Sequence, residues 1–398
     1  MATPRLYFDD PGLLTFDARV IAHGEWQGAP SIVLDRTAFY PEAGGQMADH
    51  GVLQGLRVRD VQVGDDGIVH HVVEGMLPAV GAEVHGEIDG PRRRVHRALH
   101  TGQHMLSRAL VDVARADTVS SRLGENLCTI DVDRDALDEG AVARAEALVN
   151  AVIDDDVAVR AYFPSPEELR SLPLRRAPKV TENVRVVDVK GFDVSPCGGT
   201  HCTNTAQIGL VKVTGLERYK GKMRVNFSAG RRAREELGSQ FDLLRTLARD
   251  LTCGPADVRA GLEKLRRELT EARESLGHAR AQLAEQAAST LWVAARATGS
   301  NHVIALFEEG SPDFLRIAGS RITTHADAVA FLAARGADGT AILVARGSGS
   351  TFDCGAFVKR VTAACGGRGG GKPDRAEGRV PRDADWVALV NAQLSSAG

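Results

Sequence analysis

The stretch HRALHTGQHMLSRALVDVARA, residues 96–116, is the most informative part of this sequence for predicting fold and function. Its apolar residues recur every three or four positions, which predicts an amphipathic helix. His100 and His104 are four residues apart, so both imidazoles lie on one face of that helix. Further along, a CGGTH segment supplies Cys197 and His201 on either side of a tight Gly-Gly-Thr turn. Three imidazoles and one thiolate are a ligand set typical of Zn²⁺, so we predict that these four residues bind zinc.

The residues around the first histidine pair indicate which kind of zinc site this is. Thr101 follows His100, so the helix lacks the glutamate of the HExxH metalloproteases. The paired-cysteine spacing of zinc fingers is absent as well. We therefore expect an accessible zinc ion that polarises an ester carbonyl or lowers the pKa of a bound water. Cys202 directly follows His201, and it could be either a spare thiol or a competitor for the metal.

The composition predicts a soluble protein of several domains. The chain has 398 residues, of which 43% are hydrophobic and 25% charged, and its formal net charge is −3. We expect no membrane segment, because no apolar run approaches the roughly 18 residues that a spanning helix needs. The N-terminal residues have no basic stretch before an apolar core, so no secretory signal is expected. Six widely separated cysteines favour a reduced, cytoplasmic protein.

The first part of the chain predicts two domains of different kinds. Residues 1–90 alternate apolar and polar residues in short runs between turn residues, which predicts a small β-barrel, with a sandwich as the alternative. The expected strands are 15–24, 31–35, 51–64, 68–75 and 82–89. Residues 91–235 mix helical and strand-like runs, which predicts an α+β zinc-binding domain.

The rest of the chain predicts a helical segment, 236–292, and an α/β domain, 293–398. Apolar residues between Val258 and Leu283 recur in alternating steps of four and three, as in a coiled-coil seam. The seam would pair either with residues 236–252 or with a second copy in a homodimer. In the last domain we expect strands at 302–308, 313–320 and 340–348, and helices at 327–336, 356–366 and 383–394. The glycine-rich stretch 366–371 fits an anion-binding loop and a tightly packed turn about equally well.

Further candidates for substrate binding lie outside the metal ligands. The motif FYPEAGGQMADHG, residues 39–51, places Gly44, Gly45 and Gln46 in one turn. Its backbone N–H groups and the Gln46 amide could hold a sugar hydroxyl or an aminoacyl ester, although a plain hairpin turn has the same composition. Cationic residues that could contact an RNA backbone cluster in two later segments. They are Arg218, Lys220, Lys222, Arg224, Arg368 and Lys372.

The order of these motifs resembles a known family. FYPEAGGQMADHG, RALHTGQHMLS, SPCGGTHC and GLERYKGKMRV occur in this order, as in the editing domain of alanyl-tRNA synthetase, and GGRGGGKPDRAEG resembles the DHHA1-type domain that follows it. Because no aminoacylation domain precedes them, the chain is similar to a free-standing alanyl-tRNA editing protein of the long type. The resemblance implies zinc-assisted hydrolysis of mischarged Ser-tRNA(Ala), with Gly-tRNA(Ala) as a second candidate substrate.

The resemblance also implies residue roles. His100, His104, Cys197 and His201 would bind zinc, and Gln46 with Gly44 and Gly45 would face the aminoacyl-adenosine end. Thr37, in DRTAFYPE, would recognise the seryl hydroxyl. A hydroxyl partner selects serine because alanine leaves it unpaired. The basic residues from Arg218 to Arg224 would follow the acceptor stem, and the C-terminal domain would recognise the tRNA body by its shape.

Alternatives of other classes remain. A similar histidine and cysteine pattern occurs in the editing domains of threonyl-tRNA synthetases, so a different aminoacyl-tRNA is one alternative. A non-catalytic tRNA-binding protein with a structural zinc is another, and a site with four tight protein ligands and no access for a substrate would favour it. A DHH-type phosphoesterase is disfavoured because the chain contains no Asp-His-His. A ligase is disfavoured because residues 1–90 leave no room for an ATP-binding domain.

Overall fold

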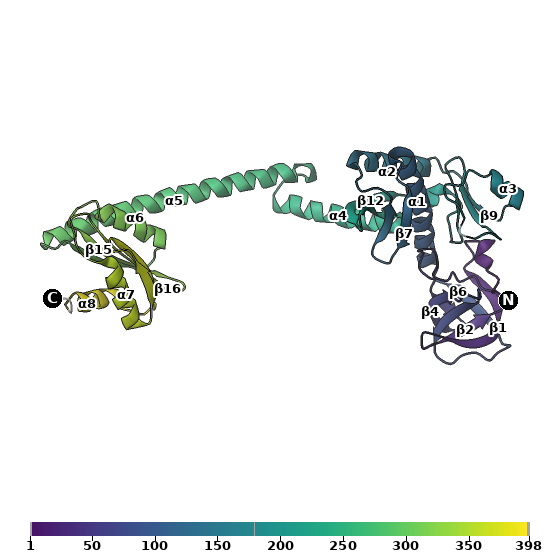
Figure 1. The fold of residues 1–398 in the computed structure, drawn as a ribbon, viewed down its shortest axis with the longest axis horizontal. Coiled ribbons are helices and arrows are strands. Elements are labelled where there is room, and N and C mark those ends of the chain that lie inside the picture. The colour runs from purple at the N-terminus through teal and green to yellow at the C-terminus, as the bar shows by residue number, and fades with distance from the viewer. Residues whose placement is uncertain (1, 179, 396–398) are drawn as a thin grey trace. The chain divides into compact units, whose positions relative to one another are not determined.

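A computed structural model describes residues 2–178 and 180–395. The chain divides into two compact units, one ending at Thr246 and the other beginning at Leu247. Figure 1 shows helices and strands in both units, so the predicted multidomain α+β organisation is confirmed. The finer division into four domains stays a prediction. No helix among the described residues is long and apolar enough to cross a membrane.

Six strands at the beginning of the chain form a barrel, closed in the order β1-β2-β5-β4-β3-β6. They are β1 (Thr15–Trp26), β2 (Ala29–Leu34), β3 (Gly51–Leu53), β4 (Leu56–Val63), β5 (Val69–Glu74) and β6 (Glu83–Ile88), after a short 3₁₀ helix η1 (Leu6–Phe8). All neighbouring strands are antiparallel. Buried and exposed residues alternate along β1 and β6, as expected when only one face of each strand points into the barrel. The expected strand 51–64 is divided by a turn into β3 and β4.

The rest of the first unit builds an α+β core around helix α1 (Gly90–Ala114). Two sheets accompany the helix, with strand orders β12-β13-β8-β7 and β11-β10-β9. The elements are β7 (Thr118–Leu123), β8 (Cys128–Val132), α2 (Glu139–Asp154), β9 (Val159–Tyr162), α3 (Pro166–Ser171), β10 (Val186–Val189), β11 (Asp193–Pro196), η2 (Thr205–Gln207), β12 (Val211–Tyr219) and β13 (Lys222–Ala229). Helix α1 begins where the Asp89 carboxylate accepts a hydrogen bond from the Arg92 N–H, and it ends at Arg115 in a left-handed conformation.

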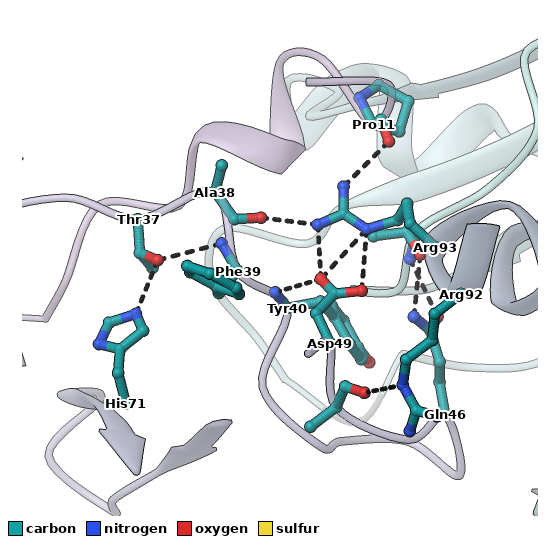
Figure 2. Close-up of polar contacts among 12 residues, drawn as sticks. Pro11, Thr37, Ala38, Phe39, Tyr40, Gln46, Asp49, His71, Arg92 and Arg93 are labelled. Carbon is teal, nitrogen blue, oxygen red and sulfur yellow. Dashed lines mark hydrogen bonds and ion pairs between the residues drawn. The ribbon is translucent and has the colours of Figure 1, made fainter. Parts of the chain in front are cut away.

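A buried ion pair joins the barrel to helix α1 (Figure 2). Arg93 Nη2 lies 2.5 Å from Asp49 Oδ2, and each side chain is only 1% exposed. The same guanidinium donates to the carbonyl oxygens of Ala38 and Pro11, while Asp49 accepts from the Tyr40 N–H. Removing one partner of such a buried pair typically costs about 3–5 kcal/mol. The contacts therefore hold the loop of residues 38–49 against the helix that carries His100 and His104.

Two long helices follow, α4 (Gly230–Asp250) and, after η3 (Pro255–Asp257), α5 (Val258–Ala297). The predicted helical segment is thus confirmed. Ala284 and Ala288 of α5 are buried in a core shared with the C-terminal sheet. Several leucines of the predicted seam are exposed: Leu262, Leu265, Leu269, Leu276 and Leu283. Pairing of this seam in a coiled coil or a homodimer stays a prediction.

The C-terminal sheet has five strands in the order β14-β15-β16-β18-β17, with only β14 and β15 parallel. The elements are β14 (His302–Phe307), α6 (Pro312–Ile322), β15 (Val329–Gly336), β16 (Gly339–Arg346), α7 (Cys354–Cys365), β17 (Arg368–Gly371), β18 (Arg375–Val380) and α8 (Trp386–Ser395). The expected strands at 302–308 and 340–348 and the helices at 356–366 and 383–394 are present, with small shifts of boundary.

Two expectations for this domain are wrong because they exchange helix and strand. Residues 313–320, expected as a strand, belong to α6, which Ser311 caps and whose buried residues lie at helical spacing. Residues 327–336, expected as a helix, mostly form β15, a strand between two others with six consecutive buried residues. A strand buried on both faces loses the alternation that identifies it, so its apolar run is easily taken for a helix.

The glycine-rich stretch is a hairpin rather than an open loop. Gly369 and Gly371 lie in the edge strand β17, where an added Cβ would come within 2.7 Å and 2.5 Å of backbone carbons in β18. The packed-turn alternative therefore describes this segment better than an anion-binding loop, because close backbone approach accounts for these glycines.

Candidate metal centre and substrate cavity

The four predicted ligands come together at one point in the first unit. Their side-chain donor atoms all lie within 4.8 Å of one another. Cys197 Sγ is 3.4 Å from His100 Nε2 and 3.3 Å from His201 Nε2. In a tetrahedral zinc site, sulfur and nitrogen ligands are about 3.5 Å apart, given Zn–S and Zn–N bonds of about 2.3 and 2.0 Å. The arrangement of these side chains therefore fits a zinc ion.

Helix α1 and the loop after β11 position the ligands, and Gln46 connects them to the barrel. Gln46 Oε1 lies 2.7 Å from His100 Nδ1, and its amide nitrogen donates to Thr200 Oγ1 at 2.8 Å. An amide oxygen only accepts, so the His100 proton lies on Nδ1 and leaves the Nε2 lone pair free for a metal. The Thr200 N–H also donates to Gln46 Oε1, at 3.1 Å. Gln46 thus fixes both the ring and the CGGTH loop.

The other two imidazoles also turn Nδ1 toward oxygen atoms, but only His201 makes a hydrogen bond there. Thr101 donates its hydroxyl proton to the Arg97 carbonyl, so its oxygen accepts from His201 Nδ1 at 3.2 Å. Behind His104, Asp193 Oδ2 lies 3.7 Å from Nδ1, within the range of an ion pair but beyond hydrogen-bonding distance. Outer contacts of this kind set the tautomer of metal-binding histidines.

Gly199 shows how tightly the loop packs on the first ligand. A Cβ at this position would lie 2.2 Å from His100 Cε1, whereas a Cβ at Gly198 would meet nothing within 4 Å. Arg185 Nη1 donates to the carbonyl oxygens of Cys197 and Gly199, which holds the loop from its other side. The loop therefore has little freedom to move away from His100.

The electrostatics of the site suit a cation. Burial alone would raise the pKa of the Cys197 thiol. The imidazoles of His100, His104 and His201 lower this pKa by more, so it lies well below its usual range. Burial also lowers the pKa of His201 to about 3. Burial opposes ionisation of Asp193, yet His104 and Arg175 hold its pKa at about 2. A thiolate and a neutral imidazole are the forms that bind zinc.

The site opens into a cavity of about 960 Å³. His100 and Cys197 form part of its wall, together with the predicted Gly44–Gly45 turn. Gly45 has φ +88°, and a Cβ there would lie 2.6 Å from the Ser121 carbonyl oxygen, so the turn requires glycine. Gln46 is buried behind His100 and is not among the described residues that line this cavity.

Thr37 is held inside the barrel (Figure 2). His71 Nδ1 is 3.0 Å from the Ile32 carbonyl, which only accepts, so Nε2 accepts the Thr37 hydroxyl proton at 2.8 Å. The Thr37 oxygen accepts from the Phe39 N–H. Thr37 is fully buried and is not among the described residues lining the metal cavity. Its contact with a seryl hydroxyl stays a prediction.

The predicted cationic residues divide into three groups. Lys220, Lys222 and Arg224 line a second cavity that shares Gly45 and residues 119–121 with the metal cavity. Arg224 is already bound to Asp131 through two hydrogen bonds. Exposed Arg218, on β12, is absent from the described lining of both cavities. Arg368 and Lys372 are exposed in the second unit, on β17 and in the turn that follows it.

Sequence reasoning missed Arg185, which contacts the metal loop and lines the cavity. It also missed Phe8 and Phe163, whose rings meet edge to face at 5.6 Å in the cavity wall. Their signals in the sequence are weak, because a single arginine just before a strand and scattered aromatic residues occur in most proteins.

Three family models match parts of the chain. Residues 184–226 match the second additional domain of threonyl and alanyl tRNA synthetases, residues 15–92 match the class II (A) tRNA synthetases, and residues 299–395 match the DHHA1 domain. The first match includes Cys197 and His201. The part of the chain that carries Cys197 and His201 is thus similar to the second additional domain of these synthetases, and the C-terminal part is similar to a DHHA1 domain.

Curated proteins that align with nearly the whole chain are more specific than the family models. The chain is 33% identical over 391 residues to an alanine–tRNA ligase of Thermococcus kodakarensis, covering 95% of this chain and 42% of the ligase. It is 28% identical to an alanyl-tRNA editing protein, AlaX-L, of Pyrococcus horikoshii, covering 97% of both proteins. The chain spans about two fifths of the length of the ligases, and nearly all of the editing protein. The resemblance to a free-standing alanyl-tRNA editing protein of the long type is therefore confirmed.

A solved C-Ala domain of Aquifex aeolicus alanyl-tRNA synthetase aligns with 24% of this chain and 91% of its own, at 21% identity and a TM-score of 0.23. This overlap is too weak to support an argument about fold or function.

Proposed function

We propose that this protein is an aminoacyl-tRNA hydrolase that removes serine wrongly esterified to alanine-specific tRNA, with glycine as a second candidate. The observation that carries the proposal is a cluster of three histidines and a cysteine that forms part of the wall of an open cavity. Similarity over nearly the full length of an alanyl-tRNA editing protein supports the same reaction. A translation-editing protein is expected to act in the cytoplasm.

The residues of the site would divide the work between metal binding and positioning. His100, His104, Cys197 and His201 would hold a zinc ion, which polarises an ester carbonyl and lowers the pKa of water when bound. Gln46, Thr101 and Asp193 would keep the imidazoles oriented. No free carboxylate on the HTGQH segment is available as a general base, so correct placement of an already activated ester would supply much of the rate.

The two joined cavities suggest a path for the RNA. The aminoacyl end would enter the metal cavity beside the Gly44–Gly45 turn, and the acceptor stem would lie along Lys220 and Lys222. Arg218 and Arg224 would contribute positive charge, although the guanidinium of Arg224 is committed to Asp131. In the second unit, Arg368 and Lys372 would contact the tRNA body.

Two alternative functions, a structural zinc protein and an enzyme for a threonyl-type substrate, are less well supported. A purely structural zinc is disfavoured because Cys197 and His100 form part of the wall of the open cavity. Editing of a threonyl-type substrate is compatible with the match at residues 184–226, which covers both threonyl and alanyl synthetases. The DHHA1 match and the alanine-specific relatives favour the alanine system.

The proposal is tested by comparing deacylation of Ser-tRNA(Ala), Gly-tRNA(Ala) and Ala-tRNA(Ala) by zinc-loaded protein. We expect rapid loss of serine and preservation of alanine. In the same assay Thr37→Val should reduce the preference for serine without loss of zinc. If zinc-loaded protein leaves Ser-tRNA(Ala) and Gly-tRNA(Ala) intact, the proposal is wrong.

A further inference from the structure

Arg185 carries two hydrogen-bond donors that the protein does not use. Its side chain is buried, with 5% exposure, and only Nη1 is bonded, to the carbonyl oxygens of Cys197 and Gly199. Nε and Nη2 are buried and have no partner among the described residues. A buried guanidinium without an anionic partner is unfavourable, so its free edge indicates a missing ligand.

The free edge has the geometry that selects oxyanions. Nε and Nη2 form the side of the guanidinium that pairs with two oxygens at once. Elsewhere in this chain Arg175 uses the same two atoms for Asp193, and Arg224 uses them for Asp131. No ion pair joins Arg185 to a carboxylate among the described residues, although one face of the guanidinium lies 4.9 Å from the Phe8 ring centre. The described residues therefore leave this edge open to a ligand from outside the chain.

The surroundings of Arg185 point to a nucleotide phosphate. Arg185 and Arg5 both line the metal cavity. Phe163 lies in the same wall, with 49% of its surface exposed, and offers a ring on which a base can stack. The described lining of the cavity has three arginines, Arg5, Arg176 and Arg185, against one carboxylate, Glu182, so its net positive charge would repel the ammonium group of an aminoacyl ester. Phosphates are the negative groups that a ground-state aminoacyl-RNA carries.

We infer that Arg185 binds the phosphodiester joining the last two nucleotides of the aminoacylated RNA. That phosphate is separated from the ester by a single ribose, and Arg185 is bonded to the backbone of a predicted metal ligand, Cys197. The contact would fix the distance between the RNA backbone and the metal centre. The inference rests on the proposed function for the identity of the RNA end, but binding tests it without any hydrolysis.

The test uses a double-mutant cycle between protein and RNA. The ligand is a minihelix ending in CCA, not aminoacylated, in which the last phosphodiester is either natural or replaced by an uncharged methylphosphonate. Affinity is measured for the wild type, Arg185→Gln and Arg185→Lys. Arg144→Gln serves as the protein control because Arg144 is exposed on α2 and is absent from the described lining of the metal cavity and of the cavities beside it. A methylphosphonate four linkages away serves as the RNA control.

We expect the terminal methylphosphonate to weaken wild-type binding by about tenfold or more, as for a lost charge-assisted contact. In Arg185→Gln the same replacement should matter less than about twofold, and Arg185→Lys, which keeps charge without the paired edge, should fall between. Arg144→Gln should behave as the wild type. Zinc content of each variant shows whether the loop is intact, and Arg185→Lys carries the test if Arg185→Gln loses zinc.

Two results would overturn the inference. An equal methylphosphonate penalty in the wild type and in both Arg185 variants would mean that Arg185 only supports the loop. A loss of deacylation rate in both Arg185 variants, with unchanged phosphate dependence, would assign Arg185 to the reacting ester. If Arg185-dependent phosphate binding is present but no seryl ester is hydrolysed, the inference stands and the proposed function fails.

Discussion

At the scale of single residues, the candidate metal centre depends on ring atoms that face away from the predicted position of the metal. His100, His104 and His201 each turn Nδ1 toward a different partner, a glutamine, an aspartate and a threonine. Spacing in the sequence predicts the four ligands, because helix periodicity and a short glycine turn are local properties. Gln46 lies 54 residues from His100 in the chain, so its contact with that ring depends on the tertiary fold. The sequence predicts that Gln46 faces the substrate, whereas the structure buries its side chain behind His100. That difference also arises from the tertiary fold.

Gly199→Ala should weaken zinc binding by about 10–100-fold, the range typical for losing support of a ligand. The added methyl group would overlap the His100 ring, which must then shift. Zinc affinity can be measured by competition with a chromophoric chelator. Gly198→Ala is the matched control, because a Cβ there meets nothing within 4 Å. Equal zinc affinity of the two variants would contradict this account of the loop.

At the scale of helices and strands, periodicity predicts the barrel strands and helix α1. It fails for α6, which it predicts as a strand, and for β15, which it predicts as a helix. The difference lies in burial. Strands β1 and β6 have one exposed face and alternate, whereas β15 is covered on both faces and does not. The junction between the barrel and α1 also escapes sequence reasoning, because Asp49 and Arg93 pair across 44 residues and have no local pattern.

The interior of the barrel should make stability depend on pH. Burial lowers the pKa of His71 from 6.5 to about 4 in the folded protein. Between these values the unfolded chain binds a proton that the folded barrel does not, so the free energy of unfolding falls as pH drops from 6.5 to 4. The slope from one such histidine is at most about 1.4 kcal/mol per pH unit. His96, whose pKa burial lowers to about 3, should act in the same direction.

His71→Gln should therefore flatten the decline in unfolding free energy between pH 6.5 and 4 by about one proton. Urea unfolding followed by fluorescence of Trp26, in a variant without Trp292 and Trp386, reports on the barrel alone. His23→Gln is the control, since that side chain is exposed on β1 and no ion pair joins it to a carboxylate among the described residues. A decline of unchanged steepness in His71→Gln would show that His71 does not titrate as proposed.

At the scale of the whole molecule, the metal site belongs entirely to the first unit, while the DHHA1 match belongs to the second. The order of motifs was enough to predict this organisation. Sequence alone could not determine whether the leucines of α5 pair within the chain or between chains, since both arrangements require the same repeat. We propose a homodimer through this seam as the simplest use of its exposed leucines.

RNA binding should depend strongly on salt, because cationic side chains would displace counterions from the backbone. Replacing Lys220 and Lys222 together by glutamine should reduce the slope of log affinity against log salt by about 2. Lys212→Gln is the control, because its ammonium group is already paired with Glu146 at 2.7 Å. An unchanged slope in the double variant would remove both lysines from the RNA interface.

The central claim is that the cluster of His100, His104, Cys197 and His201 binds a zinc ion required for ester hydrolysis. The most direct measurement is a titration of zinc into metal-free protein, recording bound zinc and the rate of Ser-tRNA(Ala) deacylation together. The account predicts a rate that rises in proportion to occupancy and levels off at one zinc per chain, with neither binding nor rate in Cys197→Ala. Full activity in zinc-free protein, or in Cys197→Ala without bound metal, would contradict it.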